Sequence, residues 1–368
     1  MYICKILIIT SLVLMFASCK HSVVVDGYSD AISIVGRVDS SEVQGPRIWA
    51  SGAYFTFAYD GDYCLINIED ENHYGDGYNY LEVVVDTLEP MRFRTVGRYN
   101  TIIIGSAPKQ SADSINYVYV HSDINAGNHA VMVVRDTESS MGYTRLLSVE
   151  AEDVRQWQPE DKYRFEFIGN SITCGAEADT TSTTSANYRW GDWHRAACSY
   201  GVLTARAFGA QYMLTSVSGI GLMHSCCDMD ITMPMVYDKI NLRDNKITYD
   251  FSFNPDFVFI CLGQNDGIQP VDEFVNNYAD FVAFVQQHSP DAQIVLLSSP
   301  MANDELVEYQ HAVLPKVVDL CKQRSIEVRT FFFSRSYNSG GADHPDVEEH
   351  SLIANELIEY VSSTLINN

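Results

Sequence analysis

Four short stretches of the sequence hold groups that could cooperate in nucleophilic catalysis. They are GNSIT at 169–173, SVSGIG at 216–221, GQND at 263–266 and HP at 344–345. A serine hydroxyl is a weak nucleophile, so it needs a base to take its proton and donors for the oxyanion that its attack creates. We interpret Ser171 as the nucleophile and His344 as the base. The N–H groups of Ser171 and Gly219, with the side-chain amide of Asn265, are the candidate oxyanion donors.

Each of these residues also has a plainer interpretation. Ser171 could cap a helix, Asn265 could close an Asx turn, and His344 could be a turn residue before proline. His350 is a rival base, although it lies inside the last expected helix. We favour catalysis because the four stretches supply a nucleophile, a base and oxyanion donors, each after an expected strand end.

The second half of the chain alternates expected strands with expected helices. Short apolar runs at 164–168, 256–261, 293–298 and 327–331 alternate with helical patterns at 200–208, 272–287, 305–323 and 347–365. This alternation predicts a parallel sheet covered by helices on both faces. Reactive groups in such sheets gather at the carboxyl ends of the strands, which is where the candidate residues fall.

The first half has a different pattern. Between residues 32 and 152, β-branched and aromatic runs are separated by turn residues, with no helical period: 53–59, 63–68, 81–85, 101–105, 117–121 and 130–135. Strands with this spacing predict an all-β sandwich of the jelly-roll kind. We therefore expect a sandwich at 32–155, a linker at 156–163 and an α/β domain at 164–368.

The N-terminus has the pattern of an export signal. Lys5 precedes an apolar run at 6–16 that is too short for a comfortable transmembrane helix, and small residues then lead to Cys19. This resembles a bacterial lipobox, so we expect residues 1–18 to be removed, lipid on Cys19 and a tether at 19–31. An ordinary signal peptide cut nearby is the alternative. The lipid would hold the exported protein in the cell envelope, on a periplasmic or outer-membrane face.

Charge and cysteine content narrow the possible ligands. The formal net charge is -24, which disfavours nucleic acid as a partner. None of the nine cysteines has the CxxC spacing of a zinc site, so we expect no metal. Cys226 and Cys227 could form a disulfide, but we favour a half-buried pair of small apolar side chains.

The four catalytic stretches resemble the SGNH hydrolase family, which is named after Ser, Gly, Asn and His in this order. The stretch at 168–173 is similar to the family's GDSIT or GDSL block, 263–266 to its GxND block, and 344–345 to its last block. A β-sandwich ahead of such a domain resembles carbohydrate esterase family 2, the acetyl-xylan-esterase-like group. Residues 129–142 are also similar to that group's sandwich segment, in which a basic residue and Thr-Glu end a strand.

The resemblance implies a serine esterase that removes O-acetyl groups from plant polysaccharide or oligosaccharide of the xylan or glucomannan type. It implies an acetyl-enzyme intermediate and no metal or organic cofactor. We expect a monomer whose partner is the acetylated glycan. Two alternatives stay open: an SGNH esterase or lipase for another acyl ester, and a non-catalytic glycan-binding lipoprotein.

Two positions depart from the family pattern. Asn170 stands where many relatives have Asp, which removes a charge beside Ser171. Gly341 stands where many relatives have the Asp that orients the histidine. Either a backbone carbonyl or another carboxylate orients His344, or the site works as a Ser–His dyad.

The segment at 176–194 is the candidate substrate wall. It contains Tyr188, Trp190 and Trp193, and aromatic faces of this kind contact sugar rings. The alternative is a loop anchored by its own aromatic side chains. His194 and His224 could line the same cleft, but we expect them at the surface.

Overall fold

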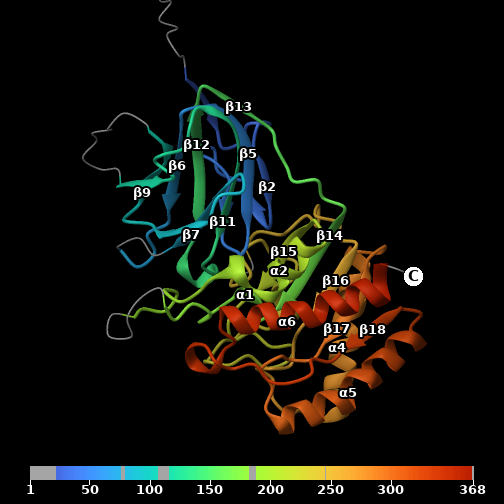
Figure 1. The fold of residues 1–368 in the computed structure, drawn as a ribbon. Helices are drawn as coiled ribbons and strands as arrows, with labels where there is room; N and C mark the ends of the chain where they lie inside the picture. Colours follow the sequence, from blue (N-terminus) through green and yellow to red (C-terminus); the bar gives the residue numbers. More distant parts are fainter. Residues whose placement is uncertain (1–21, 76–78, 107–115, 182–187, 245, 367–368) are drawn as a thin grey trace, which may run out of the picture.

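The computed structural model describes residues 22–75, 79–106, 116–181, 188–244 and 246–366. Figure 1 shows a β-sandwich, coloured blue to green, beside an α/β domain coloured yellow to red. The expected signal peptide at 1–18 and the lipid site at Cys19 lie outside the described residues.

The sandwich consists of two sheets. Within the described residues, the first has the order β10-β9-β6-β12-β4-β3, with β1 paired to β12, and the second has the order β13-β5-β11-β7-β8, with β2 paired to β5. The strands are β1 (Val23–Asp26), β2 (Ser33–Val35), β3 (Val38–Asp39), β4 (Arg47–Ile48), β5 (Tyr54–Gly61), β6 (Tyr63–Asp70), β7 (Tyr80–Val85), β8 (Met91–Arg94), β9 (Tyr99–Gly105), β10 (Asn116–Val120), β11 (Gly127–Arg135), β12 (Thr144–Ala151) and β13 (Asp153–Arg155).

Alternate side chains of both sheets form the sandwich core. Phe57, Ile66, Val83 and Val131 are among its fully buried members. The expected tether at 19–31 is partly built into this domain, because β1 pairs antiparallel with β12 from Val23 to Asp26.

The second domain has a parallel sheet with the order β15-β14-β16-β17-β18 in the described part of the chain. The strands are β14 (Tyr163–Gly169), β15 (Ala210–Ser216), β16 (Phe257–Ile260), β17 (Gln293–Leu297) and β18 (Val328–Phe331). The chain places β15 on one side of β14 and then adds β16, β17 and β18 on the other side, so the order of strand addition reverses between β14 and β16. Ligands of open parallel sheets bind beyond the carboxyl ends of the strands at such a switch point.

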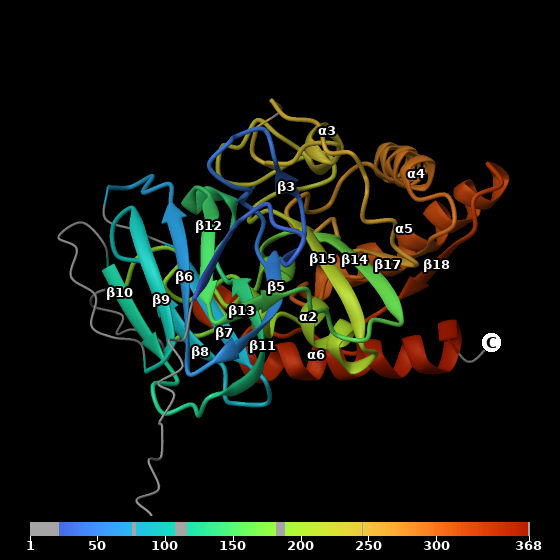
Figure 2. The ribbon, with the colours of Figure 1, turned by 90° about the horizontal axis from the view of Figure 1, so that it is seen from above.

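Helices cover both faces of this sheet, as the sequence pattern predicts. They are α1 (Ser171–Cys174), α2 (Tyr200–Ala207), α3 (Met233–Val236), α4 (Val271–His288), α5 (Asp304–Gln323) and α6 (Val347–Tyr360). Figure 2 shows α2 and α6 on one face and α4 and α5 on the other. The expected last helix at 347–365 is α6 followed by a π-helical turn over Val361–Ile366.

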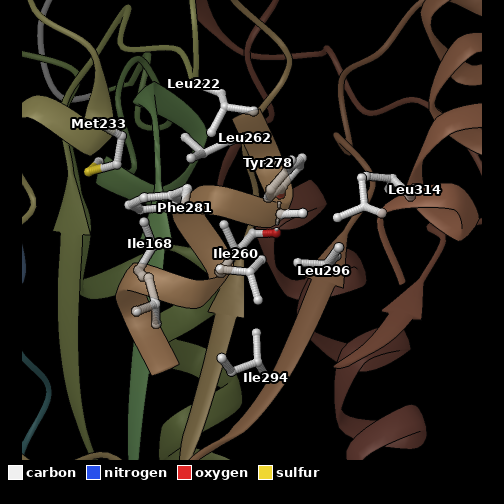
Figure 3. Close-up of a cluster of buried hydrophobic side chains, with 14 of the residues drawn as sticks. Ile168, Leu222, Met233, Ile260, Leu262, Tyr278, Phe281, Ile294, Leu296 and Leu314 are labelled. Atoms are coloured by element: carbon white, nitrogen blue, oxygen red, sulfur yellow. Dashed lines mark hydrogen bonds between the residues drawn. The ribbon is translucent and has the colours of Figure 1, made fainter. Parts of the chain in front are cut away.

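The side chains of each sheet face explain this arrangement. Phe167 and Phe259 pack with α2 and α6, whereas Ile168 and Ile260 pack with α4 and α5. Figure 3 shows the second cluster, in which Tyr278 and Phe281 of α4 contact the strands. The central strand β16 is therefore apolar on both faces, as is typical of parallel strands between helix layers.

Buried polar contacts join the two domains. Arg37 of the sandwich donates hydrogen bonds of 2.6 and 2.7 Å to the carbonyls of Tyr237 and Lys239, and it lies 3.6 Å from Glu166 of β14. Asp136, just after β11, accepts the backbone N–H of Ala197 at 3.0 Å. The bond of Asp136 holds the end of β11 against the α/β domain. Among the described residues, no helix is long and apolar enough to cross a membrane.

Candidate active site

Ser171 is the first residue of α1, directly after β14. The side chain of Asn170 caps this helix by accepting the N–H of Ile172 at 3.1 Å. Gly169 allows a tight turn, since a Cβ there would lie 2.1 Å from Thr173 Oγ1. The plainer interpretation of Ser171 was that it caps a helix, but the cap of α1 is Asn170. The serine hydroxyl faces the cleft instead.

His344 contacts Ser171 directly. Its Nε2 lies 2.8 Å from Ser171 Oγ, and its Nδ1 lies 3.0 Å from the carbonyl of Ala342 and 3.2 Å from that of Gly341. Carbonyl oxygens only accept hydrogen bonds, so Nδ1 carries the proton and Nε2 is free to accept the serine proton. The sequence left open whether a carbonyl or a carboxylate orients His344. In the structure, two backbone carbonyls do so.

The surroundings of His344 keep it neutral. Burial lowers the pKa of His344 below its usual 6.5, although the carbonyls of Ala342 and Gly341 and the charge of Glu177 act in the opposite direction. A neutral ring is the form that can remove a proton from Ser171.

Packing explains why residue 341 is glycine. A Cβ on Gly341 would lie 2.6 Å from Glu177 Oε2 and 2.8 Å from the ring of Trp193. An acidic side chain at this position would therefore collide with a buried carboxylate and an indole. Asp343, next to the base, is exposed and lines a neighbouring hollow instead.

The candidate oxyanion donors lie at the ends of β15 and β16. Gly219 has φ +82°, a conformation that favours glycine. Asn265 donates one amide hydrogen to the carbonyl of Ile220 at 2.8 Å, which fixes the orientation of its side chain beside the same loop. Asp266 accepts the N–H groups of Leu222 and Met223 at 2.9 and 2.6 Å, so it holds this loop and does not merely close an Asx turn.

These groups share one cleft of about 480 Å³. Ser171, Gly219, Asn265 and His344 all line it, and so does Trp190. The cleft therefore brings together the four candidate catalytic residues and one of the three aromatic residues of the expected substrate wall.

Tyr188 and Trp193 do not line this cleft. Their rings pack on each other at 4.2 Å, and the Tyr188 hydroxyl donates to Glu177. Trp193 also lies against the backbone of Gly341. These contacts favour the alternative of a loop anchored by its own aromatic side chains for Tyr188 and Trp193, and a substrate contact by either residue stays a prediction.

One of the other histidines differs from expectation. His194, expected at the surface, is fully buried, with Nε2 3.5 Å from Glu138 Oε1. His224 is exposed, as expected. His350, the rival base, is buried in α6 and accepts the N–H of Tyr200 at 3.2 Å, and burial lowers its pKa to about 3.

Several residues that line the cleft were not identified from the sequence. Glu138 comes from the sandwich and is fully buried. Burial alone would raise the pKa of Glu138, but His194 and the N–H of Ser218 lower it to about 2. The only available signal was its place in the Thr-Glu segment that is similar to the carbohydrate esterase sandwich.

Cys226 and Cys227 also line the cleft, and they form a disulfide. The preference for a pair of reduced, apolar side chains is therefore wrong. Cys226 is half-buried and Cys227 is exposed, because the pair lies on the rim of the cleft. Among the residues that the structure describes, no group of three or more His, Cys, Asp or Glu side chains could hold a metal ion.

Family comparisons agree with the two-domain architecture. Residues 34–160 match the family described as "Carbohydrate esterase 2 N-terminal", and residues 167–336 match the "GDSL-like Lipase/Acylhydrolase family". The two matches follow each other along the chain, and they agree with the expected β-sandwich ahead of an SGNH-type α/β domain.

Several individual relatives of the chain are carbohydrate esterases by name. The chain is 26% identical over 339 residues to an acetylxylan esterase / glucomannan deacetylase of Cellvibrio japonicus (strain Ueda107). The aligned residues cover 89% of this chain and 87% of the relative. A family two carbohydrate esterase structure from Cellvibrio japonicus has a TM-score of 0.77 at 19% identity, covering 93% of this chain and 98% of that one. One from Clostridium thermocellum in complex with cellohexaose has a TM-score of 0.76 at 24% identity, covering 91% and 99%. The two solved structures are thus family two carbohydrate esterases, and the sequence relative is an acetylxylan esterase / glucomannan deacetylase.

Proposed function

We propose that the protein is a serine esterase that removes O-acetyl groups from plant polysaccharide or its fragments. The observation that carries the proposal is the 2.8 Å contact between His344 Nε2 and Ser171 Oγ in a cleft that Trp190 also lines. Trp190 is 39% exposed, so its ring is available to a sugar. The relative named acetylxylan esterase / glucomannan deacetylase supports the xylan or glucomannan class of substrate.

The first half of the reaction acetylates the enzyme. Ser171 Oγ attacks the acetyl carbonyl carbon while His344 Nε2 takes the serine proton. The N–H groups of Ser171 and Gly219 and the amide of Asn265 donate to the oxyanion. The tetrahedral intermediate then collapses, the bond to the sugar oxygen breaks, and His344 returns the proton to that oxygen.

The second half releases acetate. Water replaces the sugar, and His344 takes a proton from it as it attacks the acetyl-Ser171 ester. When the second tetrahedral intermediate collapses, its bond to Ser171 Oγ breaks and acetate is released. His344 returns the proton to Ser171 Oγ. The base remains oriented throughout by the carbonyls of Ala342 and Gly341, so the reaction needs no third, acidic residue.

The space around the site also favours a polymeric substrate. A hollow of about 710 Å³ adjoins the catalytic cleft and shares Gln264 and Met301 with it. Sugar units on one side of an acetylated residue would have room there. Lipid on Cys19 would keep the enzyme at the cell envelope, where such fragments arrive.

Acetate release tests this function. Wild type and Ser171→Ala would be compared on acetylated xylan, on acetylated glucomannan and on a long-chain 4-nitrophenyl ester. We expect the wild type to release acetate from at least one polysaccharide, with Ser171→Ala nearly inactive. Turnover of the long-chain ester without release of acetate from either polysaccharide would reject the carbohydrate substrate and favour a lipase.

A further inference from the structure

One buried carboxylate at the cleft comes from the sandwich and not from the α/β domain. Glu138 follows β11 and is fully buried. Its Oε2 accepts a hydrogen bond of 2.8 Å from the backbone N–H of Ser218. Because Ser218 directly precedes Gly219, this bond restrains the loop that presents a candidate oxyanion donor.

Glu138 is also connected to the loop that carries the base. The buried ring of His194 lies between two carboxylates, with Nε2 3.5 Å from Glu138 Oε1 and Nδ1 4.0 Å from Glu177 Oε1. The Glu177 carbonyl accepts the N–H of Gly341 at 2.9 Å. The Gly341 carbonyl in turn accepts from His344, so a continuous set of contacts joins the oxyanion loop to the base.

We propose that Glu138 is a positioning residue through which the sandwich domain holds the oxyanion loop in its catalytic geometry. The proposal rests on the proposed esterase function. Donors aimed at the oxyanion contribute most when they are fixed in advance, so a bond that restrains Gly219 increases the rate of the chemical step. His194 lies at ion-pair distance from both Glu138 and Glu177, and so relates the position of Glu138 to the loop of His344.

A purely structural role makes a different prediction, and the chain offers a matched control. Asp136 lies two residues before Glu138, is equally buried and accepts a backbone N–H of the same partner domain, that of Ala197 at 3.0 Å. It also accepts from Arg92 Nε at 3.0 Å. Asp136 therefore joins the domains as Glu138 does, but it has no bond to the oxyanion loop.

The test compares Glu138→Gln, Glu138→Ala and Asp136→Asn with wild type, using 4-nitrophenyl acetate. We expect Glu138→Ala to lower kcat by about tenfold or more, below the roughly 10²–10³-fold cost of removing an oxyanion donor outright. KM should change little, because the lost interaction acts in the transition state. Glu138→Gln keeps an oxygen acceptor and should recover part of kcat, and Asp136→Asn should stay within about twofold of wild type.

A second measurement does not depend on turnover. A small alkylboronic acid forms a tetrahedral adduct with an active serine, so its affinity reports the oxyanion site. We expect affinity to fall in Glu138→Ala in proportion to kcat and to stay unchanged in Asp136→Asn. Equal losses in the Glu138 and Asp136 variants, or a rise in KM at constant kcat, would overturn the positioning role.

The outcomes for the two proposals are separable. A wild type that hydrolyses 4-nitrophenyl acetate but no acetylated glycan would reject the substrate and leave the Glu138 comparison valid. A wild type that hydrolyses neither would reject the esterase function. In that case only the affinity for the boronic acid would test the positioning role of Glu138. Equal affinity in wild type and Glu138→Ala would reject that role.

Discussion

At the scale of single residues, the central feature is a histidine oriented by its own backbone. The carbonyls of Gly341 and Ala342 hold the Nδ1 proton of His344, and among the described residues no carboxylate is hydrogen-bonded to this ring. A Ser–His pair of this kind leaves the nucleophile and the base in hydrogen-bond contact. Two predictions follow from the surroundings of these residues.

Restoring the family's acidic residue should harm this enzyme. In Gly341→Asp the new side chain meets Glu177 Oε2 and the Trp193 ring, so the loop must shift and carry His344 away from Ser171. We expect kcat/KM for 4-nitrophenyl acetate to fall about tenfold or more, since small misplacements of reacting groups are costly. Gly341→Ala should lose less. Higher activity in Gly341→Asp would contradict the packing argument.

The pH profile should reflect the lowered pKa of His344. In the proposed mechanism neutral His344 is the base, so kcat/KM should be retained below pH 6.5 and should decline only as the pH falls through the lowered pKa. The unfolded chain binds this proton at about pH 6.5 and the folded chain does not. The neutral ring of His344 therefore makes its full contribution to the free energy of unfolding above pH 6.5. This contribution is lost as the pH falls from 6.5 to the lowered pKa of the folded protein. An inflection in kcat/KM above pH 6.5 would show that the ring is not desolvated as described.

At the scale of elements, the loop after β15 depends on contacts made within it. The N–H of Cys226 donates to the Gly219 carbonyl at 2.8 Å, and a Cβ on Gly219 would lie 2.8 Å from Cys226 Sγ. The disulfide with Cys227 therefore packs directly on the residue that presents the oxyanion donor.

Replacing both cysteines should loosen this loop without unfolding the protein. We expect Cys226→Ser/Cys227→Ser to lose about three- to tenfold in kcat/KM, equivalent to about 0.7–1.4 kcal/mol of transition-state stabilisation. Cys198→Ser changes a half-buried free thiol elsewhere and serves as the control. Thiol titration of unfolded wild type should find two more thiols after reduction than before. Equal counts would mean that the disulfide does not form.

At the scale of the whole molecule, the sandwich and the α/β domain depend on each other. Arg37 is fully buried across the interface, opposite Glu166. Removing one partner of a buried ion pair leaves the other charge uncompensated, at a cost of about 3–5 kcal/mol.

We therefore expect Arg37→Met to lower the free energy of unfolding by about this amount in urea titrations. The double variant Arg37→Met/Glu166→Leu should recover much of the loss, because no lone charge remains buried. Arg155→Met, at an exposed pair with Asp60, should change stability by less than about 1 kcal/mol. A single Arg37 variant as stable as wild type would show that this pair does not link the domains.

The sequence predicted the architecture well because local patterns encode it. Alternating strand and helix runs indicated the parallel sheet, and the four catalytic stretches fell at its carboxyl edge. Glu138 was missed because it enters the cleft from another domain, and a backbone carbonyl such as that of Gly341 has no side-chain signature. The packing of Tyr188 against Trp193 was not foreseen because aromatic composition does not distinguish a sugar platform from a packed support.

The most direct test of the account is to locate the acetyl group during turnover. Wild type, Ser171→Ala and His344→Ala would be mixed with 4-nitrophenyl acetate, quenched in acid and analysed by peptide mass spectrometry. We predict an acetyl group on Ser171 in the wild type and no acetylated peptide in either variant. Turnover by Ser171→Ala at the wild-type rate, or wild-type acetylation at another residue alone, would contradict the claim that Ser171 is the nucleophile.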